Sequence, residues 1–250
     1  MAIAARGDGQ NLTHRIVEAL GVAIVSGVYS VKNPFPTEAD LCKQYDASRS
    51  VLREAVKMLT AKGLLRARPR QGTWVQPEEH WNLMDPDVLR WLLERRITYS
   101  LLREFAQVRL AVEPGAASMA AVTATPERKA AIRAAIEQMA QADNEESDPL
   151  PSDIAFHVAV LRASGNRFFA QLSGMTETAL RFSIRMQNRS KGVHRASVPD
   201  HRRISDAILA GDASGAEETT RTLILEAMDL IDKADAETRS AALQKARPSR

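Results

Sequence analysis

Three side chains in the second half of this 250-residue chain have the chemistry of a metal site. Asp153 and His157 stand at i and i+4 in the run SDIAFHVAVL, so on a helix they lie one turn apart and face the same direction. His201 opens a second helical run, HRRISDAIL. One carboxylate and two imidazoles that converge in a helical core suit zinc, nickel or a similar divalent ion. Such spacing alone more often marks a surface or capping arrangement, so both interpretations stay open at this point.

A charged pair stands on an otherwise apolar stretch. Arg109 and Glu113 also lie at i and i+4, in FAQVRLAVEP. Charged side chains on an apolar helix face are costly unless they are paired or bind a ligand. The pair therefore fits either a salt bridge within one helix or a guanidinium that binds the carboxylate of a ligand. Arg181 and Arg185, again one turn apart, fit either a ligand contact or an exposed surface.

The first third of the chain carries a basic helix of another kind. Ser48 is the predicted N-cap of a helix whose apolar side chains repeat at i, i+3, i+4 and i+7. Arg49, Arg53 and Lys57 follow one another at i+4 intervals beside this stripe, with Ser50 near the same end. A recognition helix contacts base edges and phosphates at this end. An ordinary solvated helix face has the same charge spacing.

A basic hairpin is predicted directly after this helix. Gly63 ends the helix in a left-handed conformation, and two short extended runs follow on either side of the tip PRQG. The tip carries Arg70 and ends at Gly72, and Arg68 precedes it. A tip of this charge suits contact with a phosphate backbone or a minor groove.

Two further helices complete the predicted DNA-binding module. One spans residues 12–26 and is stopped by Gly27, and the other opens at Thr37, whose hydroxyl caps it. Together with the basic helix and hairpin they predict a winged helix-turn-helix in residues 11–76, which places a helix in the major groove of double-stranded DNA. Residues 1–10 are predicted to be a disordered tail.

The strings PTEADLC, SRSVLREAVKML, GLL and QGTWV resemble the DNA-binding half of the GntR family of bacterial transcription regulators. In that family the start of the recognition helix and the wing tip contact the operator. Ala39 departs from the family pattern, because many relatives in the fatty-acid-regulator branch have a DNA-contacting arginine at this position. The expected DNA-binding residues are Ser48, Arg49, Ser50, Arg53, Arg68, Arg70 and Gly72.

The remainder of the chain predicts helices almost throughout. A linker at residues 77–85 leads to a helical domain at 86–235, and a charged tail follows at 236–250. The segment DPDVLRWLL begins this domain with an apolar helix that must bury itself against the next domain or a partner subunit. The other helices are expected at about 100–121, 126–143, 152–164, 167–189, 198–210 and 213–235.

The fold class that follows is mainly α, an N-terminal winged helix-turn-helix and a C-terminal all-α antiparallel bundle. The bundle resembles the ligand-sensing domain of the fatty-acid-regulator branch of the GntR family. This resemblance implies a site in the bundle, because an Asp-x-x-x-His pair and a later histidine bind metal in that domain. A third histidine commonly comes from the last helix, but Leu223 stands at the matching position.

In this branch an arginine at the position of Arg109 helps to hold the effector's carboxylate. The resemblance therefore implies a small carboxylate effector, a sugar acid such as the aldonate galactonate, with zinc or nickel as the candidate ion. Three protein ligands leave room for effector oxygens on a metal, or the same side chains bind the effector directly. The expected effector-binding residues are Arg109, Asp153, His157, His201 and Arg185, and the expected metal ligands are Asp153, His157 and His201.

Charge and composition agree with a DNA-binding regulator. Residues 1–75 hold 11 of the 34 Lys and Arg residues but only 6 of the 31 Asp and Glu residues, so the basic excess lies in the DNA-binding half. The single cysteine, Cys42, and the lack of a long apolar run predict a cytoplasmic protein with no membrane contact.

The expected function is a homodimeric repressor of a sugar-acid catabolic operon, bound to a two-fold-symmetric operator and released by its effector. One alternative is a regulator that responds to a different small organic acid. Another is a metal-dependent enzyme acting on a sugar acid. The sequence offers no separate nucleophile or general base beside the Asp/His/His group, which argues against the enzyme.

Overall fold

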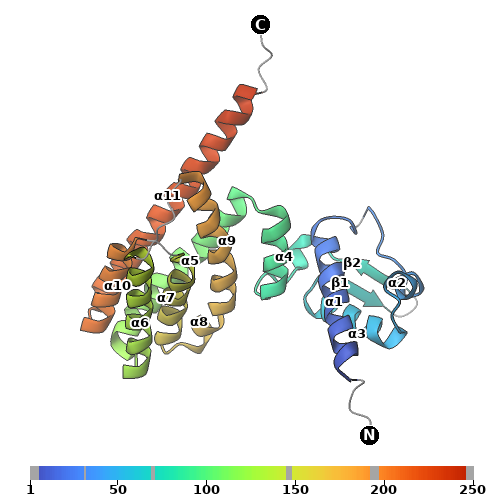
Figure 1. Cartoon of the computed structure of the whole chain (residues 1–250), viewed down its shortest axis with the longest axis horizontal. Coiled ribbons are helices and arrows are strands. Elements are labelled where there is room, and N and C mark those ends of the chain that lie inside the picture. The colour runs from blue at the N-terminus through green and yellow to red at the C-terminus, as the bar shows by residue number, and fades with distance from the viewer. Residues whose placement is uncertain (1–5, 31, 69–70, 145–147, 192–196, 246–250) are drawn as a thin grey trace. The chain divides into compact units, whose positions relative to one another are not determined.

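The computed structural model describes residues 6–30, 32–68, 71–144, 148–191 and 197–245 (Figure 1). These residues form eleven α-helices and one two-stranded sheet. The chain divides into two compact units, Met1–Ile97 and Thr98–Arg250. The predicted fold class is confirmed, since a winged helix-turn-helix is followed by a helical bundle.

The first unit has a core of three helices, and side-chain hydroxyls cap two of them. Thr37 accepts a hydrogen bond from the Asp40 N–H at 3.3 Å, and Ser48 accepts one from the Val51 N–H at 3.4 Å. Between these helices Asp46 adopts a left-handed conformation with φ 46°, which makes the tight turn. Both caps agree with the sequence-based expectation. The helices are α1 (Arg6–Val25), α2 (Glu38–Tyr45) and α3 (Arg49–Ala61).

The wing is an antiparallel pair of strands, β1 (Leu65–Arg68) and β2 (Gly72–Val75). Before it, Gly63 has φ 77°, and a Cβ added there would collide with the backbone oxygen of His80. Both the left-handed backbone and this close approach require glycine at the end of α3. A short 3-10 turn, η1 (Glu78–His80), follows the wing.

A fourth helix, α4 (Pro86–Arg96), packs on α1 within the first unit. Asp85 caps it by accepting hydrogen bonds from the N–H groups of the second and third helical residues, at 3.0 and 3.3 Å. The Trp91 side chain is 1% exposed and lies against Gly21 of α1. A larger residue than glycine would therefore separate the two helices.

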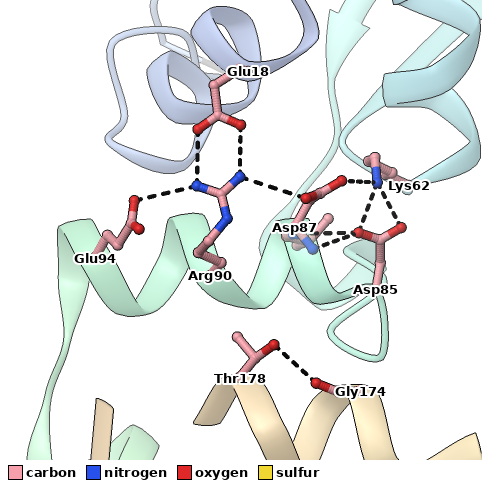
Figure 2. A network of polar contacts seen from close by, with 9 residues as sticks. Glu18, Lys62, Asp85, Asp87, Arg90, Glu94, Gly174 and Thr178 are labelled. Carbon is pink, nitrogen blue, oxygen red and sulfur yellow. Dashed lines mark hydrogen bonds and ion pairs between the residues drawn. The ribbon is translucent and has the colours of Figure 1, made fainter. Parts of the chain in front are cut away.

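Two groups of ion pairs also tie α4 to the rest of the first unit (Figure 2). Arg90 donates to both carboxylate oxygens of Glu18 on α1, at 2.9 and 2.7 Å, and this pairing lowers the pKa of Glu18. Lys62, which follows α3, donates to Asp85 at 2.8 Å and to Asp87 at 2.9 Å. Half-buried, bidentate pairs of this kind fix orientation better than isolated surface pairs do.

The position of α4 differs from the sequence-based prediction. That prediction placed a linker at residues 77–85 and assigned the next helix to the C-terminal domain. The linker segment is instead attached to the first unit, where the Asn82 N–H donates to the Lys62 carbonyl at 3.0 Å. The apolar face of α4 is covered by α1, so the boundary between units falls after Ile97. An apolar helix face predicts burial but does not identify the surface that covers it.

The second unit is a helical bundle, and its described residues contain no strand. Its core is lined by small and aliphatic side chains around Phe156. Pro114 lies inside α5 as predicted. The predicted single helix 167–189 is divided at Leu172, where one short helix ends before the next begins. The helices are α5 (Tyr99–Thr123), α6 (Pro126–Asn144), α7 (Leu150–Ala163), α8 (Arg167–Gln171), α9 (Ser173–Lys191), α10 (Val198–Ala210) and α11 (Ala213–Lys245).

Helices reach further toward both ends of the chain than the sequence suggested. The first helix begins at Arg6, inside the stretch predicted as a disordered tail, and the last ends at Lys245, inside the predicted charged tail. Residues 1–5 and 246–250 of those tails lie outside the described residues. Within its unit, α11 continues well past the other helices (Figure 1). Among the described helices, none is long and apolar enough to cross a membrane.

Candidate functional site

The residues predicted to read DNA lie on the exposed side of α3. Arg49 and Arg53 are exposed, as are Ser48 and Ser50, whose hydroxyl oxygens are 2.9 Å apart. The Arg53 Nε–H donates to Glu38 on α2 at 3.1 Å, but both side chains are largely in solvent, so this pair is weak and leaves Arg53 movable. The opposite stripe of α3 is buried through Leu52, Ala55 and Leu59.

The wing supplies a second exposed basic surface. The Arg68 guanidinium lies over the Trp74 ring, 5.7 Å from its centroid, which directs the side chain along the hairpin. Gly72 has φ 87° with open space around it, so its backbone conformation is the reason for glycine there. Arg70 lies outside the described residues, and its contact with DNA stays a prediction.

Five charged or ionisable side chains meet inside the bundle of the second unit. They come from three helices: two from α5, two from α7 and one from α10. All are buried, with 3 to 7% of their surface exposed. The structure thus brings together the predicted pair on α5 and the predicted triad. These residues are Arg109, Glu113, Asp153, His157 and His201.

The Asp/His/His triad is tight. Asp153 Oδ1 lies 3.3 Å from His157 Nε2 and 3.4 Å from His201 Nε2. The two Nε2 atoms are 3.3 Å apart. One donor atom from each of the three side chains lies within 4.8 Å of the others. The spacing of Asp153 and His157 on α7 therefore does place them on a common side, facing α10.

Hydrogen bonds on the far side of each ring determine which nitrogen faces the triad. His201 Nδ1 is 2.9 Å from the Ser197 carbonyl oxygen, which can only accept, so the proton is on Nδ1. His157 Nδ1 is 2.9 Å from Glu113 Oε2, and an ionised carboxylate likewise only accepts. Both rings therefore turn their Nε2 atoms toward Asp153.

Arg109 is engaged mainly with Glu113. Its Nε–H donates to Glu113 Oε1 at 2.7 Å and its Nη2–H to Oε2 at 3.1 Å. The same Nη2 lies 3.2 Å from His157 Nε2. Burial would raise the pKa of Glu113, but Arg109 and His157 outweigh it and lower that pKa to about 2. Both roles considered from the sequence, the salt bridge and the position beside a ligand site, are thus compatible with this geometry.

The remaining pKa shifts come from the opposite charges that face one another in the triad. Burial would raise the pKa of Asp153, but His157 and His201 outweigh it and hold that pKa far below its usual range. Burial would lower the pKa of His157, but Glu113 and Asp153 outweigh this effect and raise it. Two ionised carboxylates therefore stand beside two imidazoles in a buried site.

The triad fits a divalent metal ion. Asp153 Oδ1 is buried and receives no hydrogen bond from the described residues. Two ring nitrogens and one anionic oxygen converge there, and this arrangement needs an added proton or a cation. Two Nε2 atoms and a carboxylate, with each ring held from behind, are a donor set that zinc and similar ions accept.

Position 223, where the family's third histidine is absent, and the expected site residue Arg185 have different outcomes. Leu223 is half-buried and packs against the hydrophobic core of the bundle, so this position contributes no metal ligand. The side chain of Arg185 lies outside the described part of the chain, and its role stays a prediction. The contact of Glu113 with His157 was not anticipated, although the lone glutamate on an apolar stretch was a signal of a buried partner.

A winged helix-turn-helix with an exposed basic reading surface, joined to a helical domain with a buried charged site, defines a DNA-binding transcription regulator. Residues 12–75 match the bacterial regulatory proteins of the gntR family, and residues 104–244 match the FCD domain. The chain belongs to the GntR family of regulators and carries an FCD C-terminal domain. These matches point to a regulator and not to an enzyme, so the metal-dependent enzyme considered above is not supported.

Relatives of this chain have similar lengths. It is 35% identical to the galactonate operon transcriptional repressor of Escherichia coli over 86% of this chain and 94% of that one. It is 30% identical to the uncharacterised HTH-type transcriptional regulator YieP of Escherichia coli, over 86% and 93%. A solved GntR regulator from Rhodococcus sp. RHA1 has the same fold, with a TM-score of 0.51 at 21% identity over 89% of this chain and 98% of that one.

Proposed function

We propose that this regulator is a repressor of a sugar-acid catabolic operon, which leaves its operator when a small carboxylate such as an aldonate binds the bundle. The observation that carries the proposal is the buried group of Arg109, Asp153, His157 and His201 inside an otherwise apolar core. The similarity to a galactonate operon repressor supports an effector of the galactonate type.

In this proposal the operator is read by one helix and one hairpin. The start of α3 enters the major groove, where Arg49 and Arg53 contact base edges and the serines contact phosphates. The wing lies along the phosphate backbone of the DNA. The exposure of Ser48, Arg49, Ser50, Arg53, Arg68 and Gly72 supports this role, and Arg70 of the wing tip completes the proposed set of contacting residues.

The effector is recognised by complementary charge. Its carboxylate contacts Arg109 through Nη1, because Nε and Nη2 already donate to Glu113. Hydroxyl oxygens of the sugar acid lie toward Asp153, His157 and His201, and Arg185 contributes from α9. A buried, water-poor site strengthens each of these polar contacts, so a small ligand suffices to change the domain.

The side chains that would hold a zinc or nickel ion are Asp153, His157 and His201. FCD domains often bind metal, and the unpartnered Oδ1 of Asp153 supports such an ion here. A bound divalent ion would supply a positive centre with open positions for carboxylate and hydroxyl oxygens of the effector. Leu223 leaves this chain with three protein ligands, so we expect the effector to strengthen metal retention.

The working form is a cytoplasmic homodimer on double-stranded operator DNA. One reading helix covers only a few base pairs, and two copies related by two-fold symmetry read both halves of a palindrome. Membership of a family of regulators that are usually dimeric supports this form.

The test is a titration of the full-length protein with D-galactonate, other aldonates, hexuronates and lactate, followed by thermal shift and by release of a bound promoter fragment. We expect an aldonate to stabilise the protein and to release DNA. Arg109→Ala and His157→Ala should weaken effector binding by about 10- to 100-fold, the loss of charge-assisted hydrogen bonds, and leave DNA binding unchanged.

A matched control is Arg103→Ala on the same helix. Arg103 forms ion pairs with Asp232 and Asp235 at the surface of the bundle, so this change removes an arginine without touching the buried site. Stabilisation by lactate or a hexuronate, and not by an aldonate, would show that the regulator responds to a different organic acid. Undiminished effector affinity in both Arg109→Ala and His157→Ala would refute the proposed site.

A further inference from the structure

Glu113 takes no direct part in the binding of effector or metal proposed above, yet it is more deeply buried than Arg109. It is 3% exposed, whereas Arg109 is 7% exposed. A carboxylate that served only to neutralise Arg109 would need one good contact with the guanidinium. Glu113 instead contacts two helices, because both of its oxygens accept from Arg109 on α5 and its Oε2 also lies against His157 on α7.

The contact with α7 is as close as the contact within α5. Glu113 Oε2 is 2.9 Å from His157 Nδ1 and 3.1 Å from Arg109 Nη2. The carboxylate accepts the Nδ1–H and thereby leaves the lone pair on Nε2, which lies near Asp153 and His201. Without this acceptor the proton of His157 could move to Nε2 and donate to Asp153. In that tautomer Nε2 has no lone pair for a metal ion.

We propose that Glu113 is a positioning residue, which holds His157 in the Nδ1–H tautomer so that its Nε2 is available to a divalent cation. The Ser197 carbonyl does the same for His201. Side chains that hold metal-ligating histidines from behind commonly change metal affinity 10- to 100-fold when removed. Because Glu113 is on α5 and His157 is on α7, the geometry of the metal site depends on how these two helices pack.

The competing explanation is that Glu113 acts only through the charge of Arg109. Three full-length variants distinguish this explanation from the positioning of His157. Glu113→Met removes the acceptor and leaves Arg109 unpaired. Arg109→Met/Glu113→Met removes the acceptor but keeps the net charge of the site. Glu113→Gln keeps an oxygen that can accept the Nδ1–H.

The first measurement is Zn²⁺ affinity by competition with a chromophoric chelator, without effector. We expect a 10- to 100-fold loss in Glu113→Met, an equal loss in the double variant, and a loss of less than about tenfold in Glu113→Gln. Thermal melts of each variant verify that the bundle is folded. Affinity restored to the wild-type value in the double variant would show that charge alone explains Glu113, and would overturn the proposal.

The second measurement does not need a metal. Nitrogen-15 chemical shifts of His157 at alkaline pH distinguish the Nδ1–H from the Nε2–H tautomer, with the signal assigned by its loss in His157→Gln. The His157 ring should be in the Nδ1–H tautomer in the wild type and in Glu113→Gln. In Glu113→Met it should shift toward the Nε2–H tautomer. The inference rests on the proposed metal-assisted site. A wild-type protein that binds no zinc would refute the proposed metal site but would leave the role of Glu113 in fixing the tautomer untouched. An Nε2–H tautomer of His157 in the wild type would refute the proposed role of Glu113.

Discussion

Replacement of Gly21 by alanine should loosen α4 from the DNA-binding unit. Gly21 lies in the middle of α1, and its missing side chain leaves the space that the Trp91 ring occupies. An added Cβ would lie 2.5 Å from Cη2 and 2.7 Å from Cε3, and closer still to Cζ3. Carbon atoms pack at about 3.5–4.0 Å, so either the ring or the helix must move.

Two opposing effects determine the size of the change. Alanine in a helix interior is more stable than glycine by about 1 kcal/mol. Overpacking of a filled core costs about 1–3 kcal/mol. The ring is 1% exposed and lies beside the charged groups of Lys62 and Arg90, each 5.8 Å from its centroid, so it has little space into which to rotate. The clash should therefore outweigh the helix preference, with a net loss of up to about 2 kcal/mol.

The assay is amide hydrogen exchange of α1 and α4 in the full-length protein, because it reports local stability without isolating a unit. Gly21→Ala should reduce protection in both helices and leave α6 and α7 unchanged. In a Trp91→Leu background, where the six-membered ring is absent, the same substitution should be neutral or stabilising by up to about 1 kcal/mol. Greater protection of α1 in Gly21→Ala than in the wild type would refute the reasoning.

Four other predictions concern function. Arg49→Ala should weaken operator binding by about 1–3 kcal/mol in a sequence-dependent way, whereas Arg70→Ala should weaken all DNA sequences and reduce the salt slope by about one, as measured by anisotropy at several salt concentrations. Sedimentation of the DNA-free protein should give a dimer, and a monomer that binds one half-site tightly would contradict this. Leu223→His should increase zinc affinity if position 223 reaches the triad, and unchanged affinity would show that it does not. Insertion of three glycines between Ile97 and Thr98 should preserve both effector and operator affinity but abolish their coupling.

The sequence predicted those features that depend on local rules. Thr37 and Ser48 were identified as caps because a hydroxyl before an apolar stripe has few other uses, and the structure has both. The common direction of Asp153 and His157 followed from helical spacing alone. The break at Leu172 was missed, although Ser173 and Gly174 follow it directly in the sequence.

Features that depend on contacts between distant segments could not be read in this way. The apolar face of α4 predicted burial, but only the fit of Trp91 onto Gly21 identifies α1 as its partner. The contact between Glu113 and His157 likewise joins two helices that are far apart in the sequence. Helical periodicity shows which side of a helix a residue occupies but not which other helix it meets. The salt bridge to Arg109 was therefore one of two alternatives from the sequence, and the contact with His157 was not foreseen.

The continuity of the chain explains why the glycine insertion is the decisive test of coupling. Arg109 and Glu113 are carried by α5, which runs without interruption back to Tyr99. Next in sequence comes α4, which Arg90, Lys62 and Trp91 fix to the DNA-binding unit. In the proposed regulation, an effector that displaces α5 transmits its effect along the chain through residues 97–98, which join α5 to α4. A coupling free energy of about 1–3 kcal/mol is small enough for one such connection to carry, and a flexible insertion there would dissipate it.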